Sequence, residues 1–465
     1  MSTLAEHPLP AVPASRWRIW LLAAAVASAF FVGEQNWQVS RWEDFALDTA
    51  DMEAGAAEGS LLRQVGFSLV AAIGLVCLIC RARYVPRVRD PLALLVLFTL
   101  AWCLASVSWS IEPLLTAKRL GVVACCFLGM LGLCRQLSLR ELAWLALAVT
   151  AVYALAGLSV EMALGTFRPW SAEYRFAGTM HPNGQGVNCG LLCLAAASLA
   201  GRSARWNWLL LALAVMGGLL LALSRSRTAV IALAAALATL GLVTLAAKRS
   251  GRHEGDCSVS ASRKPGDSHG SRKPGRSPAA ALPMIGAVVF ALCAAALACS
   301  LVGYDVGGKF MDLVTLGRDT ETDDLNGRLP LWTELLDGYV SQRPLCGYGY
   351  NTFWNAANID EMSSLFYWGI REAHSGYVEA LLGIGLIGTA ALAATVALAL
   401  ARSLRACLAG GRSGDRFVLA MLVFAVVNSV TESGFVLPDW PAIMVACGLV
   451  GLVFHPLAGE TEAPP

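Results

Sequence analysis

Residues 206–247 read WNWLLLALAVMGGLLLALSRSRTAVIALAAALATLGLVTLAA, an apolar run interrupted by Arg225 and Arg227 near its middle. A helix needs about 20 apolar residues to cross a bilayer. A charge at the bilayer centre costs about 2.5–3.5 kcal/mol or more. The run therefore predicts two spanning helices joined by a tight turn, with both arginines at the membrane surface.

The rest of the chain has a similar composition. Of its 465 residues, 56% are hydrophobic and 15% are charged, too little charge to cover a soluble protein of this size. We predict an all-α polytopic membrane protein with about twelve transmembrane helices. Their expected positions are 17–33, 61–80, 91–109, 115–134, 141–160, 184–201, 206–224, 228–247, 279–302, 376–401, 417–433 and 440–455.

Arginine placement predicts the orientation. Clusters of arginine follow the second, fourth, sixth and tenth expected spans, and residues 248–278 form a linker rich in Lys, Arg, Ser and Gly. Under the twelve-span count all of these lie on one face, and the positive-inside rule makes that face cytoplasmic. Both termini are then cytoplasmic. The arginines of these clusters are Arg81, Arg83, Arg87, Arg89, Arg135, Arg140, Arg202, Arg205, Arg402, Arg405, Arg412 and Arg416.

The opposite face carries one large loop, residues 303–375, which we expect to contain short helices. Within it, PLWTELLDGYV begins with Pro330, a residue that suits a first helical turn. A helix there would place apolar side chains on one face and could lie on the membrane surface; they are Leu331, Leu335, Leu336 and Tyr339. A loop of this length without function is unusual.

Arg225 and Arg227 create an unusual turn on that outer face. Arg227 would open a helix whose N-terminus already carries positive potential. A helix N-terminus with guanidinium groups beside it suits a phosphate. The alternative is that both side chains extend to the lipid headgroups.

Other outer-face motifs carry candidate polar groups. The stretch RFAGTMHPNGQG, residues 175–186, places Arg175, His181 and Asn183 before a span, where His181 could instead cap the helix. NGRLPLW, residues 326–332, places Arg328 at a helix start, with a solvated loop arginine as the alternative.

Two further stretches add aromatic and basic candidates. In RPLCGYGYNTFW, residues 343–354, Tyr348 suits either a sugar ring or the membrane interface. In REAHSGYVEALLGIG, residues 371–385, His374 precedes a helix whose N-terminus favours a neutral imidazole, while Glu372 favours the charged form. His374 is therefore a candidate general base, or a helix cap.

Taken in order, GTMHPNGQG, SRSRTA, NGRLPLW with PLCGYGYNTFW, and AHSGYVEALLGIGLIG resemble the O-antigen ligase and polysaccharide polymerase family of bacterial inner-membrane proteins. The resemblance covers roughly 172–390. Together with the expected spans, it divides the chain into transmembrane helices 1–5 in 1–160, a ligase-like core in 161–401 that includes the linker 248–278 and the loop 303–375, and helices 11–12 in 402–465; outside 172–390 we predict topology only.

The resemblance implies a periplasmic glycosyltransferase that takes a glycan from undecaprenyl diphosphate and needs no cofactor or metal. Its acceptor is lipid A-core for a ligase, or a second lipid-linked glycan for a polymerase. Arg227 and Arg328 match the diphosphate-binding arginines, and His374 matches the essential loop histidine. Arg225 lies two residues before the family position and is either an auxiliary or a bystander. His181 and Asn183 match an element whose role is less defined.

Two other function classes remain open at this point. A lipid-linked glycan flippase or other secondary transporter would place its polar sites near the bilayer midplane, usually between internal repeats, whereas these charges gather on one face. A non-catalytic envelope scaffold would not need such a cluster. We expect membrane lipids and lipid-linked glycans as partners, and no nucleic acid.

Overall fold

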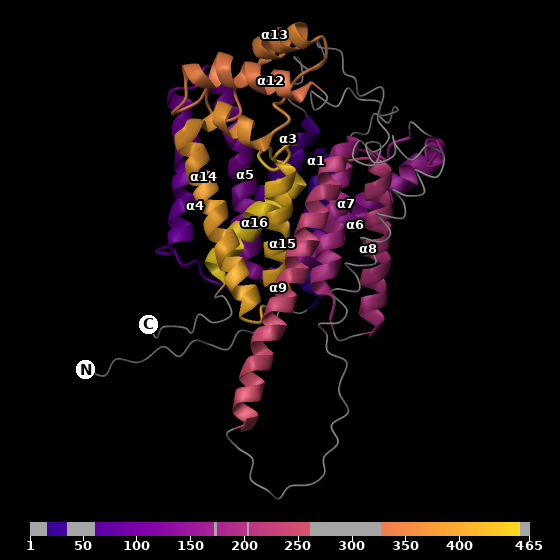
Figure 1. Ribbon diagram of the computed structural model, residues 1–465. Helices are drawn as coiled ribbons and strands as arrows, with labels where there is room; N and C mark the ends of the chain where they lie inside the picture. Colours follow the sequence, from indigo (N-terminus) through magenta and orange to yellow (C-terminus); the bar gives the residue numbers. More distant parts are fainter. Residues whose placement is uncertain (1–15, 35–60, 172–173, 202–203, 261–326, 456–465) are drawn as a thin grey trace, which may run out of the picture.

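The structure, a computed structural model, describes residues 16–34, 61–171, 174–201, 204–260 and 327–455. These residues form helices, turns and loops, with no strand among them. The long helices run side by side as a bundle, and short helices lie across one of its ends (Figure 1). The expected all-α architecture is therefore confirmed for the described part of the chain.

Eleven described helices coincide with expected spans to within a few residues. The helices that end at Ser260 and Leu408 extend past their expected ends, and the helix that ends at Asn428 stops before its expected end at 433. Seven of the described helices are long and apolar enough to cross a membrane. The expected span 279–302 lies outside the described residues, and the total of about twelve stays a prediction. The bundle helices are α1 (Arg16–Glu34), α3 (Leu61–Ile79), α4 (Pro91–Ala105, extended by η2, Ser106–Ser108), α5 (Pro113–Gln136), α6 (Leu139–Leu164), α7 (Pro182–Leu199), α8 (Ala204–Ser224), α9 (Arg227–Ser260), α14 (Gly376–Leu408), α15 (Ser413–Asn428) and α16 (Trp440–Phe454).

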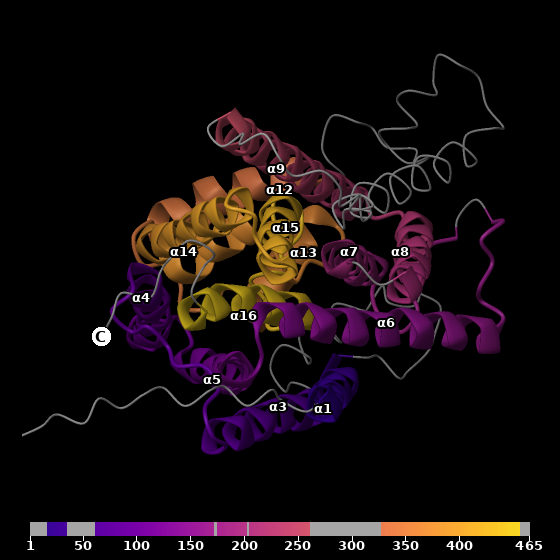
Figure 2. The same cartoon turned by 90° about the horizontal axis from the view of Figure 1, so that it is seen from below.

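The centre of the bundle is built from α7, α15 and α16, whose side chains are almost all buried. Seen along the bundle axis, α15 and α16 are enclosed by the other helices (Figure 2). Small residues allow this close packing. A Cβ added at Gly190 of α7 would lie 2.7 Å from the ring of Phe424 in α15, well inside the carbon contact distance.

The expected cytoplasmic turns gather at one end of the bundle, which we call the arginine end. There Arg83 pairs with Glu141 at 2.8 Å and Arg402 with Asp90 at 2.6 Å. Helix α9 continues beyond the bundle at this end (Figure 1) and reaches Ser260. The first part of the expected linker 248–278 is thus helical, and its remainder lies outside the described residues.

The opposite end, which we call the loop end, carries the described part of the expected loop 303–375. It contains α12 (Arg328–Glu334), the π-helical η5 (Leu335–Tyr339), the 3-10 helix η6 (Val340–Gln342) and α13 (Ala356–Phe366). Leu331 and Leu335 are fully buried against Phe353 and Ile359. Part of the expected apolar face, Leu331 and Leu335, therefore packs on the protein, whereas Leu336 is exposed.

A break inside α14 joins this loop to the bundle. Gly385 has a φ of +64°, which interrupts the helix and exposes backbone groups. The loop pairs with these groups: Tyr348 N–H donates to the Leu382 carbonyl at 2.8 Å, and Leu386 N–H donates to the Pro344 carbonyl at 2.8 Å. The loop end is thus held to α14 by main-chain hydrogen bonds.

Replacing Gly385 by alanine should destabilise the protein. A Cβ at this position would lie 2.3 Å from the Leu345 carbonyl oxygen, and the positive φ adds strain, so we expect a loss of at least about 2 kcal/mol. Thermal unfolding in detergent measures it. Gly241→Ala is the matched control, since nothing lies within 4 Å of its added Cβ; equal effects of the two substitutions would contradict the prediction.

Candidate functional site

At the loop end, several helices contact the turn that follows α15. Residues 429–432 contact the beginnings of four described helices, α7, α9, α12 and α14. Gly376, the first residue of α14, donates its N–H to the carbonyls of Ser429 (2.9 Å) and Glu432 (3.2 Å). Because a helix N-terminus carries partial positive charge, the positive ends of several helices surround this turn.

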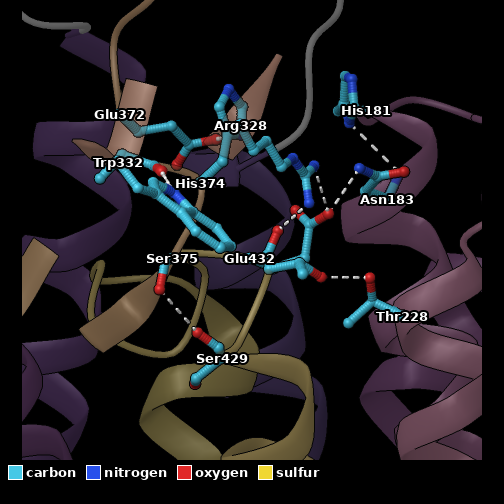
Figure 3. Close-up of polar contacts among 12 residues, drawn as sticks. His181, Asn183, Thr228, Arg328, Trp332, Glu372, His374, Ser375, Ser429 and Glu432 are labelled. Carbon is cyan, nitrogen blue, oxygen red and sulfur yellow. Dashed lines mark hydrogen bonds and ion pairs between the residues drawn. The ribbon is translucent and has the colours of Figure 1, made fainter. Parts of the chain in front are cut away.

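Arg328 opens α12 and reaches the turn with both ends of its guanidinium. Its Nη1 donates to the Thr431 carbonyl, and its Nη2 lies 3.2 Å from Glu432 Oε1. The Arg328 side chain is 18% exposed and that of Glu432 is 13% exposed. Figure 3 shows Arg328 between Glu432 and the loop that carries His374.

Asn183 binds the same carboxylate from the other side (Figure 3). Its Nδ2 donates to Glu432 Oε1 at 2.9 Å, while its Oδ1 accepts from Arg175 Nη2 at 2.7 Å. Arg175 is buried and also donates to the Ser224 carbonyl at 3.1 Å. His181 caps α7 by accepting from the Asn183 N–H. These contacts agree with the structural alternative for His181 and give Arg175 a supporting role.

The segment that carries Arg175 is shaped by a buried carboxylate. Glu161 Oε1 accepts from the N–H groups of Ala177 (2.9 Å) and Gly178 (2.7 Å). Gly178 has a φ of +62°, and a Cβ there would lie 2.6 Å from Gly157 in α6. The loop before α7 therefore packs directly on α6, and this packing fixes the position of the Arg175 backbone.

Arg225 and Arg227 lie in the tight turn between α8 and α9, as expected. Arg227 is the first residue of α9, and Arg225 adopts a left-handed backbone with a φ of +52°. Thr228, which follows Arg227, forms a hydroxyl–hydroxyl hydrogen bond with Thr431 (Figure 3). The N-terminus of α9, and with it the backbone of Arg227, is thereby tied to the turn that receives Arg328.

His374 stands next to this cluster at the end of the loop. Its backbone has a φ of +51°, and its ring stacks on Trp368 with centroids 5.5 Å apart. Its Nδ1 lies 3.4 Å from Glu372 Oε1. Burial lowers the pKa of His374, and the positive charge of Arg328 lowers it further. The negative charge of Glu372 raises it, but by less than burial lowers it. This shift favours the neutral imidazole.

Glu432 has the opposite perturbation. It lies in the turn between α15 and α16, where burial raises the pKa of its carboxyl to about 7, and Glu372 adds to the rise. Arg328 and Arg175 only partly offset this. Ionising this carboxyl group is therefore costly, because Arg328 and Arg175 do not fully offset its burial, and its protonation state changes near neutral pH.

Tyr348 does not reach this cluster. It is 8% exposed within an aromatic group that contains Tyr339 and Phe353, and its hydroxyl donates to the Tyr339 carbonyl at 2.9 Å. Arg343 lies over its ring, 5.1 Å from the centroid. These contacts account for Tyr348 as a packing residue of the loop.

The structure therefore brings two of the candidates, Asn183 and Arg328, to one carboxylate that the sequence reasoning missed, with Arg175 bound to Asn183 behind it. Glu432 comes from the expected unit 402–465, outside the expected core 161–401. The signal for it was an acidic residue at the end of the apolar run 417–433, where a carboxylate needs a partner. Trp368 was missed as well, because only the fold shows its ring against His374.

Comparison with known protein families agrees with the motifs. Residues 209–393 match a family model described as O-antigen ligase. The match includes Arg225, Arg227, Arg328 and His374, whereas Asn183 and Glu432 lie outside it. No curated protein matches the chain by sequence.

Removing the Glu432 charge should change how stability depends on pH. A carboxyl whose pKa rises from 4.5 unfolded to about 7 folded contributes stability below pH 4.5 that is lost as the pH rises to 7. The loss is on the order of 3 kcal/mol. We expect Glu432→Gln to lose less thermal stability than the unchanged protein between pH 5 and pH 8. Parallel melting curves across this range would contradict the prediction.

Proposed function

We propose that the chain, whose residues 209–393 match the O-antigen ligase family model, is a membrane glycosyltransferase. The proposed donor is a glycan on undecaprenyl diphosphate, and the proposed site is the cluster at the loop end. The reaction would transfer the glycan to an acceptor on the periplasmic side of a bacterial inner membrane. It would require no metal.

One observation carries the diphosphate assignment. The Arg328 guanidinium and the N-termini of α7, α9 and α14 all approach the turn occupied by the Glu432 carboxylate. Guanidinium groups and helix N-termini are the usual partners of phosphate oxygens. Glu432 holds these groups as an internal anion would, and we propose that the donor diphosphate takes over Arg328, together with Arg227 at the start of α9.

The diphosphate would be held as a leaving group. When the glycosidic bond breaks, its electron pair stays on the diphosphate oxygen, and the new negative charge must be stabilised. Arg227 and Arg328 would supply that stabilisation, with Arg225 as an auxiliary. Arg175 and Asn183 would act behind them, because they position Glu432 and the start of α7.

His374 would accept the proton of the attacking hydroxyl. Glu372 Oε1 lies 3.4 Å from Nδ1, and its negative charge would favour the neutral tautomer with the proton on Nδ1, which leaves Nε2 basic. Glu372 would then stabilise the imidazolium that forms. Attack opposite the leaving group would invert the anomeric centre, so a product that kept the configuration of the donor would contradict this mechanism.

The acceptor separates the two activities within the family, and the contacts of the described residues do not favour either one. A polymerase would use a second lipid-linked repeat, and a ligase would use lipid A-core. The orientation follows from the arginine end, whose basic turns suit the cytoplasm. The loop end then faces the periplasm, where both kinds of acceptor are found.

Replacing Arg328 by lysine should lower the turnover of the donor by about 10- to 100-fold, because an ammonium group cannot form two directed hydrogen bonds at once. Arg227→Lys should act in the same direction. Arg343→Lys is the matched control, since Arg343 lies over Tyr348 on the same loop away from the cluster. Full activity of Arg328→Lys would remove it from diphosphate binding.

The reaction itself can be tested with purified protein in lipid, with EDTA and an undecaprenyl-diphosphate-linked repeat as the only glycan. Ladders of longer lipid-linked chains would identify a polymerase, and transfer only after addition of lipid A-core would identify a ligase. His374→Ala should lower either rate by about 100- to 10,000-fold, the usual contribution of a general base. Inactivity of the unchanged protein with both acceptors would favour a transporter instead.

A further inference from the structure

Ala373, the residue before His374, has both of its backbone polar groups, the N–H and the carbonyl, in hydrogen bonds to side chains. Ala373 is fully buried. Its N–H donates to Glu379 Oε2 at 3.0 Å, and its carbonyl accepts from the indole Nε1 of Trp332 at 2.8 Å. The two partners come from different elements, α14 and α12. We call Glu379 and Trp332, with the Ala373 backbone between them, the Ala373 clamp.

Glu379 is itself fixed in place. It is 4% exposed, and the same Oε2 atom accepts from the indole Nε1 of Trp354 at 2.9 Å. Glu379 lies in the first turn of α14, before the break at Gly385. A buried carboxylate that accepts two directed hydrogen bonds has little freedom to move, so it can serve as a fixed point for the loop.

His374 needs such support because its backbone is left-handed, with a φ of +51°. Residues other than glycine occupy this region only where the surroundings hold them there. On its other side, Ser375 and Gly376 donate to the Ser429 carbonyl. The clamp and the turn after α15 therefore hold His374 from both chain directions.

We propose that Glu379 and Trp332 are positioning residues that set the place of the His374 ring for catalysis. This inference rests on the proposed function, in which His374 is the general base. Trp332 lies one helical turn after Arg328 in α12, so its bond to Ala373 also fixes the spacing between the base and the arginine of the leaving group. A displacement of about 1 Å in such a pair costs about 100-fold in rate.

Three substitutions test the clamp. Trp332→Phe keeps the ring and removes only the N–H donor, and Glu379→Leu removes the acceptor. We expect each to lower kcat by about 10- to 100-fold, with less than about a threefold change in the KM for the lipid-linked donor. Glu379→Gln should retain kcat within about threefold, because its amide oxygen can accept both hydrogen bonds that Glu379 Oε2 accepts.

Trp109→Phe is the matched control. The Trp109 indole also donates to a carbonyl of the same loop, that of Cys346 at 3.0 Å, but this bond lies away from His374. We expect kcat to change by less than about threefold. If Trp109→Phe lowered kcat as much as Trp332→Phe, the effect would be a general loosening of the loop, and the positioning role would be overturned.

Amide hydrogen exchange at Ala373 tests the clamp without reference to activity. In the unchanged protein and in Glu379→Gln this N–H should be protected, and in Glu379→Leu its exchange should rise at least about tenfold. Unchanged protection in Glu379→Leu would overturn the clamp. If Glu379→Leu does not fold, the kcat of Trp332→Phe against its control decides the question alone.

The exchange measurement also separates this inference from the proposed function. If His374→Ala kept full activity, His374 would not be the base, and the positioning role would fall with it even where Ala373 remains protected. If His374→Ala is inactive while Trp332→Phe keeps full kcat, the base assignment stands and the positioning role is overturned. Loss of kcat in Trp332→Phe and Glu379→Leu, with rescue in Glu379→Gln, supports both.

Discussion

The carboxylate of Glu432 is the constraint on which the arrangement of the loop end depends. A carboxylate buried at the end of a helix bundle requires donors, and here they come from Asn183 of α7 and Arg328 of α12. The neighbouring Thr431 adds contacts to Thr228 and Arg328. Satisfying one short turn thus brings together segments that are far apart in the sequence.

The same arrangement supports the proposed diphosphate site. Arg328 and the helix N-termini already surround the Glu432 carboxyl group, so the proposed diphosphate would need little reorganisation to bind there. Burial raises the pKa of the Glu432 carboxyl to about 7, so its negative charge is costly to maintain at this position. A fully solvated glutamate would remain charged and would compete more strongly for Arg328.

The base side of the site is organised separately. Hydrogen bonds to the backbone hold the chain on both sides of His374, and its Nδ1 lies 3.4 Å from Glu372 Oε1. The break in α14 at Gly385 ties the loop that carries Tyr348 to the same helix that begins after His374. Through α12 and α14, the groups that would hold the leaving group and the group that would take the proton belong to one connected structure.

Much of the bundle could be predicted from the sequence, because apolar length and arginine placement act locally. The run 206–247 predicted α8, α9 and the turn at Arg225 and Arg227, and the same reasoning located eleven described helices. Helix propensity and membrane length depend on neighbouring residues only. Burial of Leu331 and Leu335 by Phe353 and Ile359 could not be predicted, because an apolar face does not specify whether lipid or protein will cover it.

What the sequence by itself determined is the membrane bundle, the family resemblance and the residue types suited to a diphosphate and a base. What only the tertiary structure decided is which of these side chains meet. Glu432 is 104 residues from Arg328 and 249 from Asn183 along the chain, and no local pattern connects them. Their contact depends on how α7, α12 and the end of α15 pack, because ion pairs and hydrogen bonds act only over a few ångströms in space.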